Sequence, residues 1–127
     1  MPVTILIVDD SKLARIVAGK AVSELQPDWS KIEAGSAAQA LDVIANQQID
    51  VAMIDFNMAG MDGLELAGEL RVLYPNLPLA IITANVQDEI IARAREIGAA
   101  FVPKPVTADG LEPFISGAAL RLRSHRA

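Results

Sequence analysis

Five short apolar runs alternate with segments of helical periodicity along this chain, and this alternation constrains the fold more than any other feature. The runs occupy residues 3–8, 30–34, 50–56, 79–83 and 100–102. They are too short for buried helices and most are rich in residues that favour strands. Strands that alternate with helices form βαβ units around a parallel sheet. We therefore predict a doubly wound parallel α/β fold.

The segments between the strands carry apolar residues at helical spacing. Ser11 is the predicted cap of a first helix that ends before Pro27, and further helices are expected over residues 36–46, 64–74 and 87–97. Gly98 is expected to end the last of these helices. The predicted inward residues are Leu13, Ile16, Val17, Ala21 and Leu25 on the first helix, Ala40, Leu41 and Ile44 on the second, and Leu66, Ala67, Leu70 and Leu73 on the third.

A final helix is expected over residues 110–123, although Gly110, Pro113 and Gly117 disfavour a helix interior. Proline lacks the backbone N–H and is tolerated only in a first turn. We therefore predict that this helix begins late, near residues 110–112. Residues 123–127 are interpreted as a tail or the start of a linker.

The composition fits one compact domain over residues 1–127, with a core of about residues 3–122. The chain is 52% hydrophobic and 21% charged, and it contains no cysteine, which excludes disulfides and thiolate metal sites. Its net charge of −5 argues against a surface that binds nucleic acid. Neither a membrane span nor a signal peptide is apparent, so a cytoplasmic location is expected.

Polar side chains follow the predicted strands at the points where the strands end. Asp9 and Asp10 follow the first strand, and Asp55 lies at the end of the third. Thr83 ends the fourth strand, and Lys104 follows the fifth. Each residue alone has a plain structural explanation, such as a helix cap or a solvated lysine. Together they predict one site, because ligands of open α/β sheets bind beyond the carboxyl ends of the strands.

Three converging carboxylates repel one another unless a cation lies between them. Two unit charges about 4 Å apart cost roughly 1 kcal/mol in water and about 4 kcal/mol at an effective dielectric constant of 20. Oxygen ligands in small number favour Mg²⁺, with several retained waters, over zinc or a caged Ca²⁺. Such a metal typically acts on a phosphoryl group, to which Lys104 would add a positive charge and Thr83 a hydrogen bond.

These features resemble the receiver domain of two-component response regulators, a CheY-like family. The matching segments are the acidic pair in VDDS, Asp55 in MIDFNMAGMDG, the pair Thr83-Ala84 and the pair Lys104-Pro105, in the family's order. The resemblance extends from Val3 to about Leu122. It implies a flavodoxin-like (βα)5 sheet with the strand order 2-1-3-4-5 and a phosphorylation-dependent signalling switch, typical of bacterial phosphorelays.

The resemblance also implies a phosphoacceptor and a metal site. Asp55 would accept a phosphoryl group from a histidine kinase or a histidine phosphotransfer protein. Mg²⁺ would be bound by Asp10, Asp55 and the backbone carbonyl of Asn57, with Asp9 contributing through a metal-bound water. The protein would catalyse only its own phosphoryl transfer and autodephosphorylation, so it is not expected to be a dedicated enzyme.

Three further residues acquire expected roles in the same way. Lys104 would pair with a phosphoryl oxygen, and the Lys104–Pro105 peptide bond would be cis. Thr83 would move to hydrogen-bond the phosphoryl group. Phe101 matches the aromatic residue that rotates in the family's switch, and its alternative is an ordinary core phenylalanine.

The partner and the context of the domain stay open at this point. The expected partners are the phosphoryl donor and an unidentified downstream protein or output domain, with the chain a monomer or a phosphorylation-dependent dimer. It could be a free-standing regulator or part of a longer regulator or hybrid kinase. Ala59 stands where many receivers have proline, and Asn57 and Asn85 occupy positions that influence the lifetime of the acyl phosphate.

Other classes of protein fit the sequence less well. A flavodoxin-like FMN carrier would need a phosphate loop rich in Ser, Thr and Gly where this chain has Asp9 and Asp10. A magnesium-dependent phosphatase with an aspartyl-phosphate intermediate generally needs a second acid at the position of Asn57. A receiver fold used only for docking is the remaining alternative. An EF-hand loop fails at Ala59 and Leu66.

Overall fold

The computed structural model describes residues 3–58, 62–84 and 87–126, the last three of these by their backbone alone. Ala59 and Asn85 therefore lie outside the described residues. The sheet consists of β1 (Thr4–Val8), β2 (Ser30–Ala34), β3 (Val51–Asp55), β4 (Leu79–Thr83) and β5 (Ala100–Pro103). All pairings are parallel, and the strand order is β2-β1-β3-β4-β5. The predicted fold class and strand order are confirmed.

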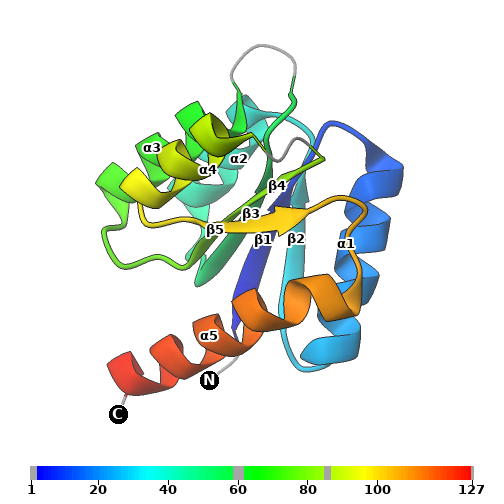
Figure 1. Cartoon of the computed structure of the whole chain (residues 1–127). Helices are drawn as coiled ribbons and strands as arrows, with labels where there is room; N and C mark the ends of the chain where they lie inside the picture. Colours follow the sequence, from blue (N-terminus) through cyan, green and yellow to red (C-terminus); the bar gives the residue numbers. More distant parts are fainter. Residues whose placement is uncertain (1–2, 59–61, 85–86, 127) are drawn as a thin grey trace.

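Five helices connect and cover the strands: α1 (Lys12–Leu25), α2 (Ala37–Asn46), α3 (Gly63–Leu73), α4 (Asp88–Glu96) and α5 (Ala108–Arg126). Helices α1 and α5 lie on one face of the sheet, and α2, α3 and α4 lie on the other (Figure 1). Strand residues alternate between the two layers: Leu6 and Ile54 pack toward α2–α4, whereas Ile7 and Met53 pack toward α1 and α5. None of the helices in the described part of the chain combines the length and the apolar character that a membrane span requires.

The inward face of α1 differs from the prediction. Leu13, Ile16 and Val17 are 71%, 45% and 40% exposed. Ala21 is buried and Leu25 packs against the core as predicted, but the other buried residues of the helix are the smaller Ala18, Gly19 and Val22. Both stripes have helical spacing, so the sequence pattern did not distinguish them. Small side chains on the inner stripe let the helix lie close to the sheet, and the larger ones are left on the outer surface. Ser11 caps the helix as predicted, accepting a hydrogen bond from the backbone N–H of Ala14.

The buried face of helix α3 also differs from the prediction, but at fewer positions. Leu66, Ala67 and Leu70 are buried as predicted, but Leu73 is 58% exposed and Leu64 is buried in its place. Leu73 is the last residue of the helix. The next residue, Tyr74, is the C-cap and leaves the helical conformation, so helical spacing no longer predicts which residues are buried there.

Arg71 ties the ends of α3 and α4 together. Its Nε donates to the carbonyl of Ile97 at 2.7 Å, and its Nη2 donates to the carbonyl of Gly98 at 3.2 Å. Its Nη1 donates to the carbonyls of Tyr74 and Pro75 on the other side. The C-terminal end of α4 is therefore anchored, whereas its N-cap, Gln87, makes no side-chain capping bond.

Helix α5 begins at Ala108, earlier than predicted, and Pro113 lies in its interior. Thr107 caps the helix: its Oγ1 accepts from Gly110 N–H at 3.0 Å, and its carbonyl accepts from Leu111 N–H at 2.9 Å. Leu111 and Ile115 are 0% and 1% exposed. The cap and this burial outweigh the bond that Pro113 cannot donate, and Pro113 itself is exposed. The prediction of a late start was wrong because it considered proline without the preceding cap.

We expect Pro113→Ala to raise the free energy of unfolding by about 1–2 kcal/mol. Alanine restores one helical hydrogen bond, and the gain is less than the roughly 3 kcal/mol interior cost because proline also restricts the unfolded chain. Urea denaturation measures the change. Arg123→Ala, an exposed substitution on the same helix, should stay within about 0.5 kcal/mol of wild type. A Pro113→Ala protein no more stable than wild type would contradict the assignment of Pro113 to the helix interior.

Candidate functional site

Three carboxylates meet at the carboxyl edge of the sheet. Oxygens of Asp9, Asp10 and Asp55 all lie within 4.8 Å of one another. The neighbouring strands β1 and β3 bring them together, since Asp55 ends β3 and the acidic pair follows β1. Asp9 and Asp55 are 5% and 1% exposed, whereas Asp10 is exposed. The structure thus brings together the acidic cluster that the sequence predicted.

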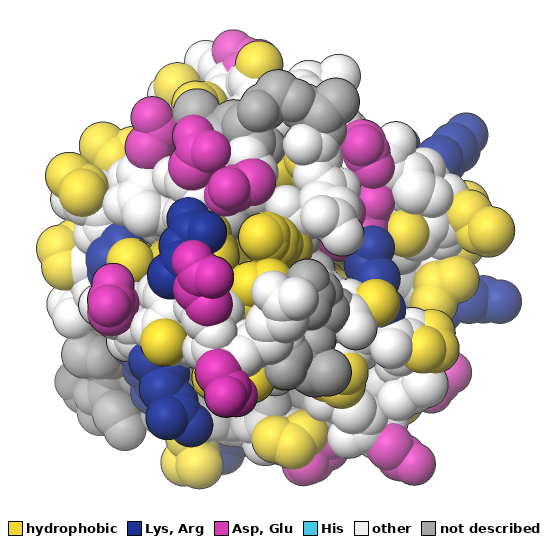
Figure 2. Space-filling view, turned by 45° about the horizontal axis from the view of Figure 1, so that its top comes forward, with side chains coloured by type: hydrophobic (Ala, Val, Ile, Leu, Met, Phe, Trp, Pro, Cys, Tyr) yellow, Lys and Arg dark blue, Asp and Glu magenta, His cyan; other side chains and the backbone are white. Residues whose placement is uncertain are grey.

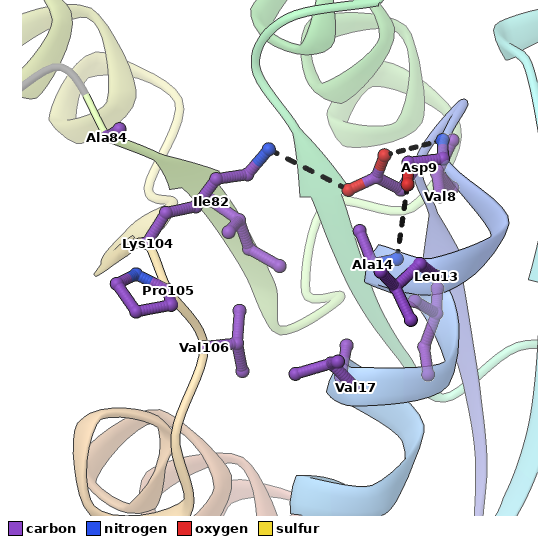
Figure 3. Close-up of a pocket in the computed structure, with 13 residues that line it drawn as sticks. Val8, Asp9, Leu13, Ala14, Val17, Ile82, Ala84, Lys104, Pro105 and Val106 are labelled. Carbon is purple, nitrogen blue, oxygen red and sulfur yellow. Dashed lines mark hydrogen bonds and ion pairs between the residues drawn. The ribbon is translucent and has the colours of Figure 1, made fainter.

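Lys104 reaches these carboxylates from the segment after β5. Its Nζ lies 2.7 Å from Oδ1 of Asp55 and 3.9 Å from Oδ2 of Asp9. Figure 3 shows the lysine extending across the end of β4 toward Asp9. Its backbone N–H donates to the carbonyl of Thr83 at 3.0 Å, and the Lys104–Pro105 peptide bond is cis, as the family resemblance predicted.

Burial and the neighbouring charges shift the pKa of Asp55 above its ordinary value. Burial raises the pKa of the Asp55 carboxyl, the contact with Lys104 lowers it in part, and the charges of Asp9 and Asp10 raise it again, so that the net shift is upward. Burial lowers the pKa of Lys104, but its contact with Asp55 more than compensates, and the pKa lies above its ordinary value. One ammonium group is therefore insufficient to neutralise three acids.

The remaining predicted site residues lie at or near the same edge. Thr83 is the last residue of β4 and is fully buried. Asn57 is exposed and follows β3 by two residues. Phe101, on β5 opposite Ile81, is half-buried and packs against the core layer of α2–α4.

The start of α3 approaches the backbone of the acceptor strand very closely. A Cβ added to Gly63 would lie 2.2 Å from the carbonyl oxygen of Asp55 and 2.9 Å from Cα of Phe56. The N–H of Gly63 donates to the carbonyl of Phe56 at 2.9 Å. Only glycine fits here, so Gly63 helps to fix where β3 ends. Sequence reasoning did not single out this residue; its position directly after the N-cap Asp62 was the available signal.

An apolar groove of about 400 Å³ adjoins the acidic cluster. Leu13 and Val17 of α1 lie on one side of it, and Pro105 and Val106 lie on the other (Figure 3). Figure 2, in which the top of Figure 1 is turned forward, shows hydrophobic and acidic side chains beside one another on this face. The sequence prediction missed this groove because it assigned Leu13 and Val17 to the core.

The donor set fits a hard divalent cation. All the candidate side-chain ligands are carboxylate oxygens, which Mg²⁺ prefers. The buried Oδ1 of Asp55 accepts no well-directed hydrogen bond from the described residues, and its contact with Lys104 is an ion pair of poor hydrogen-bond geometry. Such an atom retains a lone pair that a cation could use.

A family comparison and curated relatives agree on what this chain is similar to. The family model described as "Response regulator receiver domain" matches residues 5–115. Sporulation initiation phosphotransferase F of Bacillus subtilis is 30% identical over 95 residues, which are 75% of each chain. Sensor histidine kinase RcsC of Salmonella typhi is 34% identical over 97% of this chain but only 13% of its own length. Response regulator MprA of a Mycobacterium species is 33% identical, with 48% of its length covered.

Solved structures show the same fold. A CheY-like receiver domain protein from Methanospirillum hungatei superposes with a TM-score of 0.86 over 98% of this chain and 99% of the other, at 24% identity. Chemotaxis protein CheY4 of Vibrio cholerae gives a TM-score of 0.83 at 22% identity, over 93% of this chain and 99% of the other.

We expect Gly63→Ala to lower the free energy of unfolding by about 1–3 kcal/mol, because the added methyl group meets backbone atoms that cannot move aside cheaply. Gly68→Ala on the same helix is the matched control. A Cβ there meets nothing within 4 Å, so this variant should gain up to about 1 kcal/mol from helix propensity. Urea denaturation compares the two variants, and equal effects would contradict the close approach.

We expect Lys104→Met to lower the free energy of unfolding by an amount that depends on pH. Loss of the ammonium group raises the pKa of Asp55 further. A carboxyl whose pKa is higher in the folded than in the unfolded chain makes folding less favourable as the pH rises through these two values. The stability difference between wild type and variant should therefore be small near pH 4 and grow toward pH 7.

Denaturation at several pH values measures this difference. Lys20→Met, an exposed substitution on α1, should show a difference that does not change with pH. A constant difference for Lys104→Met would mean that Lys104 does not compensate the charge of Asp55.

Proposed function

The chain belongs to the response regulator receiver family, and we propose that it is a phosphorylation-dependent switch whose phosphoacceptor is Asp55. One observation carries this proposal: the most buried carboxylate of the acidic cluster has an ammonium group 2.7 Å away. A nucleophile for phosphoryl transfer needs an unprotonated oxygen, and Lys104 favours that form of Asp55. The charge of Lys104 then remains beside the phosphoryl oxygens.

The proposed reaction is an in-line displacement. An oxygen of Asp55 attacks the phosphorus of a phosphohistidine, a P–O bond forms, the P–N bond breaks, and the leaving imidazole takes up a proton. The product is an acyl phosphate on Asp55. Transfer of this kind depends on positioning and charge neutralisation more than on a general base, which agrees with a site of carboxylates and one lysine.

We assign the metal ligands in the same proposal. Asp10, Asp55 and the backbone carbonyl of Asn57 would bind Mg²⁺, and Asp9 would act through a metal-bound water. When bound, the cation neutralises charge on the transferring phosphoryl group. Asp10 is suited to the role of ligand because it is exposed and no hydrogen bond to another described residue holds its side chain.

Thr83 and Phe101 would relay the phosphorylated state. Thr83 ends the strand beside Asp55 and would hydrogen-bond the phosphoryl group. Phosphorylation adds about −1.5 to −2 charge at this point. Phe101 is half-buried on β5 and packs against the core layer of α2–α4, where a change at Thr83 on the neighbouring strand would alter its packing. A downstream protein or output domain would detect this change.

We infer that the phosphoryl donor is a histidine kinase or a histidine phosphotransfer protein. The groove lined by Leu13, Val17 and Val106 supports a protein donor, since it offers exposed apolar surface beside the acceptor. The chain covers 75% of one curated relative but only 13% of RcsC and 48% of MprA, so the activities of those whole proteins are not transferred to it. We place the domain, residues 1–127, in the cytoplasm as a monomer or phosphorylation-dependent dimer.

Incubation with Mg²⁺ and acetyl phosphate, followed by intact-mass spectrometry, tests the proposal. The wild-type chain should gain one phosphoryl group, and Asp55→Asn or removal of Mg²⁺ by a chelator should abolish the gain. Asp28→Asn, an exposed aspartate far from the site in the sequence, should behave as wild type. A folded wild-type chain that gains no phosphoryl group from acetyl phosphate or from a phosphorylated kinase would favour a docking role instead.

A further inference from the structure

Arg15 makes an unusual contact with the backbone of the acidic pair. It lies in the first turns of α1, and its Nη1 donates to the carbonyl oxygen of Asp9 at 2.6 Å. That oxygen belongs to the peptide unit that joins Asp9 to Asp10. A guanidinium group on this carbonyl therefore restrains the plane of the peptide that leads into Asp10.

A second contact fixes the guanidinium group itself. Nε of Arg15 donates to Oε1 of Glu33 on β2 at 2.9 Å, and the arginine side chain is only 17% exposed. Gly35 also leaves space for the guanidinium group, because a Cβ at this position would lie only 3.2 Å from Nη1 of Arg15. The arginine thus links the edge strand to the turn between β1 and α1.

The two aspartates depend on this link to different degrees. The Asp9 side chain is held by its own bond, because Oδ1 accepts from the N–H of Ser11 at 2.9 Å. The N–H of Asp9 donates to the carbonyl of Ala34 at 3.1 Å. The Asp10 side chain is exposed and has no hydrogen bond to the described residues. Its place in the cluster is therefore set by its backbone.

We propose that Arg15 is a positioning residue for the cation site: it holds the Asp9–Asp10 peptide in the orientation that directs the Asp10 carboxylate toward Asp55. This inference rests on the proposed function, because it concerns the ligand that would bind Mg²⁺ there. Two features of arginine are required. It has several donors in a fixed planar fork, which lets it bind Glu33 and the Asp9 carbonyl together. A lysine ammonium group cannot reproduce that fork.

A positioning role and a purely electrostatic role of Arg15 predict opposite changes in Mg²⁺ affinity when Arg15 is replaced. If Arg15 acts only as a positive charge near a cation site, its removal must strengthen Mg²⁺ binding. If it positions Asp10, its removal must weaken binding in spite of the lost repulsion. Residues that orient metal ligands typically contribute about 10–100-fold to metal affinity. Lys12, an exposed cation next to Ser11, provides the matched control for charge alone.

Isothermal titration of the full chain with Mg²⁺ tests the inference. We expect Arg15→Gln to weaken binding about tenfold and Arg15→Lys, which keeps the charge, to weaken it nearly as much. Lys12→Gln should bind Mg²⁺ as tightly as wild type or slightly more tightly. Asp10→Asn should abolish measurable binding and thereby show that the cluster is the site titrated.

A measurement without metal separates positioning from loss of folding. In amide hydrogen exchange, Arg15→Gln should raise the exchange rate of the 9–11 backbone, while β3 and β4 stay as protected as in wild type. Exchange that rises equally across all strands would mean global destabilisation and would overturn the inference. Arg15→Lys with wild-type affinity, or Arg15→Gln with raised affinity, would overturn it in favour of a charge effect.

The outcomes also distinguish this inference from the proposed function. A wild-type chain that binds no Mg²⁺ overturns both the metal assignment and the inference. A wild-type chain that binds Mg²⁺ through Asp10, with unchanged affinity in both Arg15 variants, overturns the inference alone and leaves the phosphoacceptor proposal standing.

Discussion

The burial of Asp55 among like charges is the constraint on which the rest of the site depends. A carboxylate that is 1% exposed, next to Asp9 and Asp10, is unfavourable unless positive charge is supplied. The fold supplies one ammonium group through Lys104, held by its backbone bond to Thr83 at the end of β4. The charge that remains uncompensated is what a bound cation would neutralise. The strand order is what makes this possible, because it places the ends of β1, β3, β4 and β5 along one edge.

Much of this edge was predictable from the sequence, for a physical reason. A strand of a buried parallel sheet has a clear apolar pattern, and the polar residue that ends the pattern marks the edge. Asp55 and Thr83 were located in this way, and the structure places both at strand ends. The cap Ser11 was predictable because a hydroxyl group before an apolar stripe can accept a hydrogen bond from the first turn of the helix.

The features that escaped prediction depend on contacts between segments distant in the sequence. Two stripes on α1 had the same periodicity, and only packing against β1 selects the one with Ala18 and Val22. The exclusion of a side chain at Gly63 depends on where β3 ends. The link from Arg15 to Glu33 joins residues 18 positions apart, and no local pattern indicates it. Pro113 was misjudged for the opposite reason, since a local rule was applied without the cap at Thr107.

Among the described residues, side-chain hydrogen bonds hold α4 at its C-terminal end, whereas its first turn is held by the burial of Ile90. Arg71 fixes its last turn to the end of α3 through the carbonyls of Ile97 and Gly98. A helix of nine residues is about 13 Å long, so a tilt of about 10° around the anchored end moves the first turn by roughly 2 Å and the last turn hardly at all. The first turn, which carries Asp88 and Glu89, is also the end nearer to Thr83 in the chain. A tilt of this kind would change the angle at which the outer face of α4 meets its surroundings.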